Sequence, residues 1–453
     1  MKYPLRDDTI VALSTASGEA AIAVIRYSGP DSVRIVQSLI QLRSNKNLSL
    51  LPPRRLANCA VLDSGAVLDE GMVVRFASPA SYTGEDLVEL HIHGNPIITD
   101  RILELSIELG ARIASAGEFT RRAVVNGKMN LLQAEAVGAL IAAESRQSVM
   151  LAHRQLHGEL SEKLYSFRSQ LLSLLARLEL ELDFIEEGYE FASEQEISDL
   201  LSAVRLYVEE LIRTSPTAER LSRGPRILLL GRPNAGKSSL FNAILGYSRS
   251  LVSITPGTTR DYLEERFIHN GITIRLIDTA GIRDVNDEIE KEGIHRALGM
   301  VPVCDQILYL IDSTDSVLMD EEMGSVQELQ RQYPAIPIVP VFTKSDVSHY
   351  RSSNHLTLSI KYPATITTLL DTLSMGATTQ TSDLLALLNT RQLNLLKQIH
   401  GLIHEIQSQT GMIPTEVLST LLREILEPIS ELVGETTSED VLNTIFDSFC
   451  IGK

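Results

Sequence analysis

Residues 231–239 read Gly-Arg-Pro-Asn-Ala-Gly-Lys-Ser-Ser and directly follow a short apolar run at residues 226–230. A helical pattern at residues 240–245 comes immediately after them. An apolar strand, a glycine-containing loop and a helix N-terminus in this order form the context that a phosphate-binding loop requires. Backbone N–H groups of such a loop cradle phosphate oxygens. We therefore predict an α/β domain whose phosphate loop binds a nucleotide.

The phosphate loop supplies the first group of candidate ligand contacts. Lys237 would reach the β- and γ-phosphate oxygens, and the Ser238 hydroxyl would hold Mg²⁺. The nucleotide contacts predicted in this loop are Asn234, Ala235, Gly236, Lys237, Ser238 and Ser239.

A second motif follows a strand pattern at residues 272–277, which begins after the hairpin signal Asn270-Gly271. It reads Asp-Thr-Ala-Gly and consists of Asp278, Thr279, Ala280 and Gly281. An aspartate at the end of a strand beside the phosphate loop can hold Mg²⁺ through water. The Gly281 N–H can meet the γ-phosphate, so we predict all four residues as nucleotide contacts.

A third strand pattern at residues 336–342 leads into Thr343-Lys344-Ser345-Asp346. This resembles the Asn-Lys-x-Asp motif of the G proteins, with threonine in place of asparagine. Asp346 can accept both guanine N–H groups, whereas adenine has nothing to offer there. A site built to form such buried hydrogen bonds rejects a ligand that lacks the matching groups by a factor of about 10⁴–10⁵. We predict guanine as the base, with Ser359, Ile360 and Lys361 as the last contacting segment, although the G-protein pattern there is Ser-Ala.

The water-orienting glutamine of Ras-like enzymes is replaced by isoleucine at position 282. Asn234 and oxygens of residues 253–261 could instead hold a monovalent cation against the phosphates. An arginine finger contributes about 10³–10⁵ in rate. A fixed K⁺ could place positive charge at the same point, so we predict hydrolysis that depends on a cation.

Composition limits the remaining possibilities. The 453 residues are too many for one core and carry a formal net charge of −17, so any RNA contact must be local. Cys59, Cys304 and Cys450 are far apart and odd in number, which favours a reducing compartment. No signal core or membrane-length apolar run is present in the sequence, so we expect a cytoplasmic protein without a membrane contact.

Four segments differ in their apolar patterns. Residues 1–119 read as mixed α and β, and residues 87–93 alternate as in a half-buried strand. Residues 120–223 and 375–453 read as helical, on either side of the α/β segment at 224–374. The first helical segment has apolar residues at intervals of three and four at Leu164, Phe167, Leu171, Leu174, Leu178, Leu182 and Ile185. The second has them at Leu384, Leu388, Leu395, Ile399 and Ile403. We predict a multidomain α+β and α/β fold, with the α/β domain inserted into a helical domain.

Several other segments are family signatures, at residues 23–29, 81–86, 117–123, 126–128, 256–261 and 449–453. With the phosphate loop, they make the chain resemble the tRNA-modification GTPase family MnmE (TrmE) along its whole length. Four positions depart from the family pattern: Asn95, Ala116, Val124 and Thr343.

The resemblance implies three domains: an N-terminal domain that binds folate and forms a homodimer, a helical domain, and an inserted Ras-like G domain. It implies a GTPase that requires Mg²⁺, is activated by K⁺, and works on tRNA with the FAD-dependent partner MnmG (GidA). Together they would install an aminomethyl-type group on C5 of the wobble uridine, position 34. The one-carbon donor would be a tetrahydrofolate, either 5-formyl or 5,10-methylene.

The resemblance also assigns roles to individual residues. Glu290 would position the attacking water, with Lys237 as the other catalytic residue. The K⁺ ligands would be Asn234, Ser253, Thr255 and Thr258, and the Mg²⁺ ligands Ser238 and Thr259. Ser253, Thr258 and Thr259 would also contact GTP. The folate contacts would be Arg26, Glu89, Lys128 and Lys453, and Cys450 is a candidate for the modification chemistry.

Some residues have a second interpretation. Glu89, His91 and His93 share one strand face and could be read as a metal site, although a polar ligand-facing surface is favoured. Arg121 and Arg122 could touch RNA or only water, and Cys450 could be a buried, inert thiol.

The end of the chain has its own pattern. Thr437 would cap a last helix whose apolar residues are Val441, Leu442, Ile445, Phe446 and Phe449. We expect that helix to dock on the helical domain and to hold the terminal Cys-Ile-Gly-Lys in an ordered position.

Two rival functions remain open. A ribosome-assembly G protein would share the nucleotide motifs but needs an RNA-binding appendage, usually basic, and this chain is acidic. A folate-binding scaffold with a lapsed G domain is disfavoured by the intact Lys237, Ser238, Asp278 and Asp346.

Overall fold

The computed structural model describes residues 8–184, 192–247, 263–278, 299–348, 350, 355–378, 384–409, 413–447 and 449–452. The chain forms two compact units. Unit 1 comprises Met1–Gly138, Arg154–Val208 and Asn394–Lys453, and unit 2 comprises Ala139–His153 and Glu209–Leu393. The chain therefore leaves unit 1 twice and returns to it twice.

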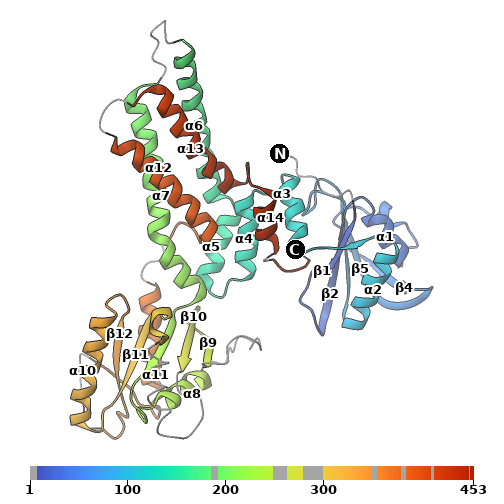
Figure 1. Ribbon diagram of the computed structural model, residues 1–453. Helices are drawn as coiled ribbons and strands as arrows, with labels where there is room; N and C mark the ends of the chain where they lie inside the picture. Colours follow the sequence, from blue (N-terminus) through green and yellow to red (C-terminus); the bar gives the residue numbers. More distant parts are fainter. Residues whose placement is uncertain are drawn as a thin grey trace. The chain divides into compact units, whose positions relative to one another are not determined.

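Unit 1 contains a seven-stranded sheet, drawn in blue to cyan in Figure 1, with the strand order β3-β4-β5-β6-β2-β1-β7. Its strands are β1 (Ile10–Leu13), β2 (Ala20–Ser28), β3 (Ile40–Leu42), β4 (Ala57–Asp63), β5 (Ala66–Phe76), β6 (Leu87–Gly94) and β7 (Arg112–Ile113). Neighbouring strands are antiparallel except β1 and β7, which are parallel. The alternation at residues 87–93 correctly predicted a strand.

One face of this sheet is covered by α1 (Ser32–Leu39) and α2 (Pro96–Glu108). Along β2, Ala23, Ile25 and Tyr27 are buried because alternate residues of a strand point to the same face. Asn95 caps α2 by accepting a hydrogen bond from the Ile97 N–H, and proline at the first helical position suits a helix start.

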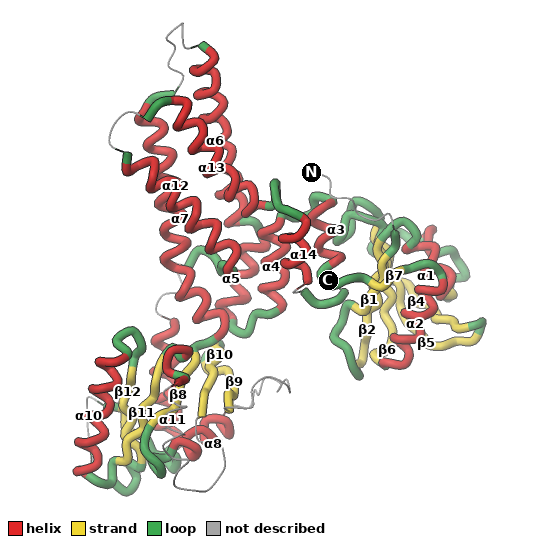
Figure 2. Tube along the Cα trace, in the orientation of Figure 1, coloured by secondary structure: helices red, strands yellow, loops and turns green. Residues whose placement is uncertain are grey.

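The other helices that belong wholly or partly to unit 1 are drawn in Figure 2 as red tubes, the colour of all helices there. They are α3 (Glu118–Val125), α4 (Leu131–Ile141), α5 (Arg146–Leu156), α6 (Glu159–Asp183), α7 (Glu194–Arg223), α12 (Thr390–Ser408), α13 (Thr415–Val433) and α14 (Glu439–Asp447). Helix α13 packs against α6, where the apolar stripe from Leu164 to Leu178 is buried as expected for a bundle core. The helical pattern predicted from Leu384 begins too early, because α12 starts at Thr390 and Leu384 and Leu388 are buried in the coil before it.

Helix α14 carries the apolar face that the sequence predicts. Leu442 and Phe446 are buried against Leu131 and Ala134 of α4. The predicted cap is wrong by one residue: the Ser438 hydroxyl accepts from the Val441 N–H, whereas the Thr437 hydroxyl donates to the Glu431 carbonyl. The helix begins at Glu439, so residue 438 and not residue 437 stands at the N-cap position.

Unit 2 contains a six-stranded sheet in the order β13-β12-β11-β8-β10-β9. The strands are β8 (Arg226–Leu230), β9 (Leu263–His269), β10 (Ile272–Asp278), β11 (Gln306–Asp312), β12 (Ile338–Thr343) and β13 (Leu356–Thr357). All neighbours are parallel except β9 and β10, which form the predicted hairpin through Asn270 and Gly271, both at positive φ. The helices packed on the sheet include α8 (Lys237–Tyr247), α10 (Ser316–Gln332) and α11 (Pro363–Thr378).

The multidomain α+β and α/β fold class is therefore confirmed. Among the described residues, none of the helices is both long enough and apolar enough to cross a membrane.

Candidate functional site

The phosphate loop connects β8 to α8. Gly231 and Gly236 have φ angles of +137° and +95°, and Asn234 has +62°. These angles favour glycine, and asparagine tolerates them better than most residues. A Cβ atom on Gly231 would also collide with the backbone carbonyl oxygen of Leu310 in β11. The loop conformation therefore depends on glycine at 231 and delivers the chain to the N-terminus of α8, where unpaired N–H groups can bind phosphate.

Lys237 lies across this loop. Its Nζ donates to the carbonyl oxygens of Gly231 and Arg232, at 2.7 and 2.8 Å. Ser238 and Ser239, in the first turn of α8, are exposed. The ammonium and the serine hydroxyl thus lie at the helix end where phosphate and Mg²⁺ were predicted to bind.

The loop is also fastened to α10. Arg232 forms ion pairs with Glu321, at 3.0 Å, and with Glu322. Glu322 is 4% exposed, and this burial raises the pKa of Glu322. A charge pair with one buried member resists breakage, because the remaining partner would be left uncompensated. The ion pairs therefore limit movement of the loop at Arg232.

The base-reading segment meets the phosphate loop at Thr343, the last residue of β12. Its hydroxyl lies 2.8 Å from the Ala235 carbonyl oxygen and 3.1 Å from that of Ile311. Thr343 is 3% exposed. The threonine that departs from the usual asparagine thus connects the phosphate loop to two neighbouring strands.

Asp346 lies in the turn after β12. Its carboxylate accepts a 2.8 Å hydrogen bond from the Ser359 hydroxyl and lies 2.7 Å from Lys361 Nζ. The bond from Lys361, with that from Ser359, lowers the pKa of the Asp346 carboxyl. The group is therefore an ionised acceptor, as guanine N–H recognition requires. Ile360 is 50% exposed and presents its side chain to solvent.

Asp278 ends β10, where it pairs in register with Leu229 of the parallel strand β8. It is 3% exposed. Parallel strands end at the same sheet edge, so this carboxylate lies at the edge where the phosphate loop begins.

Nine predicted site residues lie outside the described residues: Ser253, Thr255, Thr258, Thr259, Thr279, Ala280, Gly281, Glu290 and Lys453. Those in the described part of unit 2 come from the ends of β8, β10 and β12 and from the segment that follows β13. The arrangement can bind a phosphate group and a base bearing two N–H donors.

Unit 1 holds the second group of predicted contacts. Arg26 on β2 and Glu89 on β6 are opposite each other in the sheet, with Arg26 Nη2 2.7 Å from Glu89 Oε1. The guanidinium also lies over the rings of Tyr82 and Phe119, with centroid distances of 5.5 and 5.8 Å. The side chains of Arg26 and Glu89 are each only 18% exposed, so the pair is largely shielded from solvent.

The metal interpretation of Glu89, His91 and His93 fails on geometry. His93 Nδ1 pairs with Asp69 at 2.7 Å, and in the described chain no cluster of three or more His, Cys, Asp or Glu side chains could hold a metal. Lys128 is exposed, and its aliphatic chain lies near Gly84.

Comparison with known proteins covers both units. A family model described as the GTP-binding protein TrmE N-terminus matches residues 9–128, and the MnmE helical domain model matches residues 131–450. The chain belongs to the MnmE (TrmE) family of tRNA modification GTPases.

Full-length relatives share this assignment. The tRNA modification GTPase MnmE of Christiangramia forsetii is 35% identical, and the alignment covers 99% of each chain. The Aquifex aeolicus protein of the same name is 36% identical over 98% of this chain and 100% of its own. The Acinetobacter baylyi protein of that name is 36% identical over 100% of this chain and 98% of its own.

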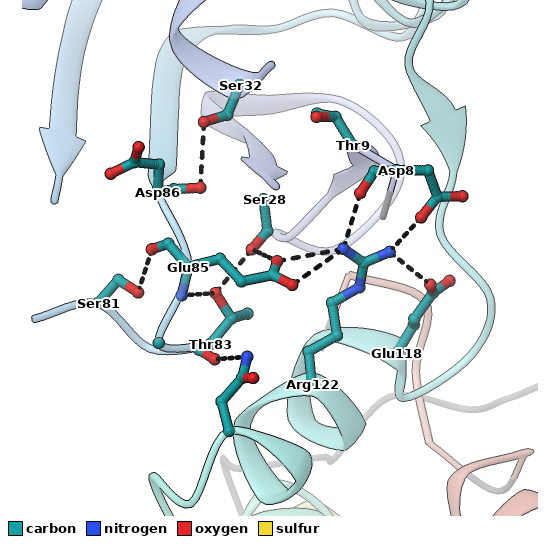
Figure 3. A network of polar contacts seen from close by, with 12 residues as sticks. Asp8, Thr9, Ser28, Ser32, Ser81, Thr83, Glu85, Asp86, Glu118 and Arg122 are labelled. Carbon is teal, nitrogen blue, oxygen red and sulfur yellow. Dashed lines mark hydrogen bonds and ion pairs between the residues drawn. The ribbon is translucent and has the colours of Figure 1, made fainter. Parts of the chain in front are cut away.

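Two MnmE signature segments, residues 81–86 and 117–123, meet in unit 1 around Arg122 (Figure 3). Arg122 is 1% exposed and donates to Asp8 Oδ1 at 2.7 Å, to Glu118 at 3.0 Å, and to Glu85 at 3.1 Å. Glu85 in turn accepts from Ser28 at 2.7 Å. The network joins the 81–86 loop to α3 and to the start of β1.

The two arginines, for which contact with RNA or with water alone was expected, both form bonds within the chain. Arg122 contacts carboxylates inside the protein, and Arg121 donates to Asn443 at 2.9 Å and to Glu439 at 3.2 Å on α14. Both side chains therefore make contacts within the chain. No feature of the sequence near residue 121 indicates that its partner lies more than 300 positions away.

The C-terminal segment is held against the end of β1 and the residues that follow β7. Ile451 forms a bridge with Ala116, and the Ser14 hydroxyl donates to the Gly452 carbonyl at 3.1 Å. Gly452 has a φ angle of +95°, and a Cβ there would collide with the Leu13 carbonyl oxygen. Cys450 is exposed, which rejects the buried-thiol interpretation.

Sequence reasoning missed two residues of the nucleotide-binding unit. Asp312 ends β11 and pairs with Lys344, and Glu322 pairs with Arg232. Asp312 could have been predicted as a site residue because it ends an apolar strand pattern, and the carboxyl ends of parallel strands meet at one sheet edge. Glu322 lies in the middle of an amphipathic helix and had no such signal.

Proposed function

We propose that this chain hydrolyses GTP and thereby takes part in modification of C5 of the wobble uridine of certain tRNAs. The observation that carries the proposal is the convergence of Lys237, Asp278 and Asp346 at one edge of the parallel sheet, in a chain aligned with tRNA modification GTPases from end to end. A phosphate-binding loop and an ionised carboxylate for guanine are the two parts that distinguish a GTP site.

The residues divide the task as follows. The phosphate-loop N–H groups and Lys237 bind and orient the phosphates, and Asp346 binds guanine. Thr343 keeps these two parts in register through Ala235. Catalysis of phosphoryl transfer consists mainly of positioning and charge stabilisation, so this rigidity contributes directly to the rate.

Side chains at the phosphate loop and the neighbouring strand end offer oxygen ligands for two cations. Ser238 is exposed in the first turn of α8, and Asp278 lies at the neighbouring strand end, so the two can hold Mg²⁺ directly and through water. Asn234 is exposed on the loop and offers an amide oxygen for K⁺. When bound, K⁺ would supply positive charge beside the phosphates. The proposed partners of these residues, Thr259 for Mg²⁺ and Ser253, Thr255 and Thr258 for K⁺, and the water-positioning Glu290 lie outside the described residues.

In unit 1 we assign the folate to the region of Arg26, Glu89, Lys128 and the C-terminal Lys453. A tetrahydrofolate has a polar pteridine edge and a carboxylate tail. The half-buried Arg26–Glu89 pair beside Tyr82 and Phe119 offers donors, an acceptor and aromatic surface to the ring. Cys450 precedes Lys453 by three positions and is exposed, so its thiol is available for modification chemistry. A homodimer and an FAD-dependent partner, MnmG, complete the proposal.

The proposal is tested by mass spectrometry of tRNA nucleosides from cells that lack this chain, with a strain complemented by the intact gene as control. We expect the aminomethyl-type wobble uridines to disappear and to return on complementation. Unchanged wobble uridines would refute the role in modification, and the GTPase assay of the purified chain would still report on hydrolysis separately.

A further inference from the structure

A basic loop joins β3 to β4 in unit 1. It consists of residues 43–56 and contains Arg43, Lys46, Arg54 and Arg55, all exposed. No aspartate or glutamate occurs from position 32 to position 62, in a chain with a net charge of −17. The base of the loop is closed by a 3.2 Å hydrogen bond from the Arg43 N–H to the Asn58 carbonyl. The four cationic side chains therefore belong to one loop, the two ends of which are joined by this hydrogen bond.

The basic loop is held in place by its own contacts. Leu48 is completely buried and anchors the middle of the loop, with its N–H donating to Gln37. Asn47 caps the short helix Leu48–Leu50 by accepting from the Ser49 N–H at 2.9 Å. The Arg54 N–H donates to the Arg75 carbonyl at 2.8 Å. A loop ordered in this way presents its cations without a large entropic cost on binding.

The positive charge of the basic loop is only partly neutralised. Arg43 pairs with Glu70 at 2.8 Å, but both side chains are 65% exposed, so the pair is weak. Within the described part of the chain, no carboxylate lies within ion-pair distance of Lys46, Arg54 or Arg55. Other arginines of unit 1, such as Arg34 and Arg101, do have carboxylate partners. The loop therefore keeps an excess of positive charge at the protein surface.

The chemistry of the basic loop fits a nucleic-acid backbone. It has cations, serine hydroxyls and asparagine amides, which are the usual donors to phosphate and sugar oxygens. It has no aromatic residue on which an unpaired base could stack. A polyanion approaching so acidic a chain needs a local positive surface, because charge elsewhere repels it.

We propose that the basic loop, residues 43–56, is a binding surface for the phosphate backbone of tRNA. The inference rests on the proposed function, which makes tRNA the substrate, and adds where the chain holds it. The loop contributes affinity that is independent of base sequence, so the choice of tRNA is made elsewhere.

The test compares two double variants of the full chain with equal change of charge. Lys46→Gln/Arg55→Gln removes two cations from the basic loop. Arg331→Gln/Lys397→Gln removes two exposed cations elsewhere and is the matched control. Binding of an unmodified tRNA transcript is measured by fluorescence anisotropy at several salt concentrations. The slope of log K against log salt is negative, and each lost phosphate contact decreases its magnitude by about 0.7–0.9.

We expect the loop variant to bind tRNA more weakly. The magnitude of its negative slope of log K against log salt should decrease by about 1.4–1.8, whereas the control should stay close to wild type. GTP hydrolysis without tRNA should be the same in all three proteins, because unit 2 carries the nucleotide site. An unchanged circular dichroism spectrum and urea unfolding midpoint show that unit 1 of the variants is folded. Equal binding by the two variants would overturn the proposal, whether both match wild type or both weaken through bulk charge.

A protein-binding role is the alternative, since Leu50 and Leu56 beside the cations are 73% and 52% exposed. Normal tRNA binding by the loop variant, together with loss of a protein partner, would establish that role and overturn ours. Failure of the proposed function can be distinguished from failure of the loop proposal. It would appear as unchanged wobble uridines in cells that lack the chain, whatever the loop variant does in the binding assay.

Discussion

The Thr343 hydroxyl donates to the Ala235 carbonyl at 2.8 Å and thereby joins the base-reading segment to the phosphate loop. The two residues are 108 positions apart, and both are buried. This hydrogen bond therefore connects the two parts of the nucleotide site directly.

Replacing Thr343 by valine keeps the shape of the side chain but removes the hydroxyl. The buried Ala235 carbonyl then loses a donor, which costs about 1–3 kcal/mol. We expect weaker binding of both GTP and GDP, measured by displacement of a fluorescent nucleotide. Thr343→Ser keeps the hydroxyl and serves as control, and a valine variant that binds as well as the serine variant would contradict the role of this bond.

Hydrolysis should depend on the monovalent cation. We expect GTP turnover to be several-fold faster in K⁺ than in Na⁺ at equal ionic strength. Position 282 carries isoleucine in place of the water-orienting glutamine, and a bound K⁺ would supply the positive charge that an arginine finger supplies elsewhere. Asn234→Ala should remove the K⁺ effect and leave nucleotide binding largely intact. Asn242→Ala, on the exposed face of α8, should retain the effect. Equal rates in the two salts for the wild-type chain would refute the cation hypothesis.

Glu290 is proposed to position the attacking water. Such an interaction is made in the transition state, so Glu290→Ala should lower kcat far more than it weakens GTP binding. Single-turnover hydrolysis under K⁺ measures the effect, with the neighbouring Glu288→Ala as the control. A Glu290 variant with near-normal turnover would indicate a surface glutamate without a catalytic role.

Gly452 tests whether the position of the tail matters. Alanine there would place a Cβ against the Leu13 carbonyl oxygen at a φ of +95°. We expect Gly452→Ala to displace the last residues and to lower tRNA modification and folate binding, as deletion of residues 450–453 should do more completely. GTP hydrolysis should be spared in both, because unit 2 carries its own site. Normal modification by the deletion variant would show that Cys450 and Lys453 are not at the active site.

The Arg122 network should make stability depend on pH. Burial acts to raise the pKa of Glu118, but hydrogen bonds from Arg112, the Ser115 N–H and Arg122 outweigh it and leave the pKa below its ordinary value of 4.5. The carboxylate therefore stabilises the fold fully above pH 4.5, and this contribution is lost as the pH falls through the lowered pKa.

Glu118→Gln should accordingly lower the free energy of unfolding by about 1.5–3 kcal/mol at pH 7 and by less at low pH. Urea unfolding at both pH values measures the difference. Glu104→Gln is the control, since its ion pair with Arg101 is 63% exposed on the glutamate side and should contribute little at any pH. A pH-independent difference for Glu118→Gln would exclude the ion network as its cause.

The sequence alone was sufficient for the parts of the nucleotide site that are contiguous in the chain. The strand, loop and helix from Arg226 to Tyr247 are neighbours in sequence, so their motif carries its own geometry. The hairpin at Asn270 and Gly271 was predictable for the same reason, because the turn depends on two adjacent residues.

Only the tertiary structure decided how distant residues combine. Arg121 finds its partners on α14, Arg122 gathers carboxylates from three segments, and Gly452 fits against Leu13. Patterns along a chain report local backbone preference and which face is buried, but not which buried faces meet. Charge pairing and close backbone approach depend on distances between residues that are far apart in the chain. Those distances are set only when the two units have folded.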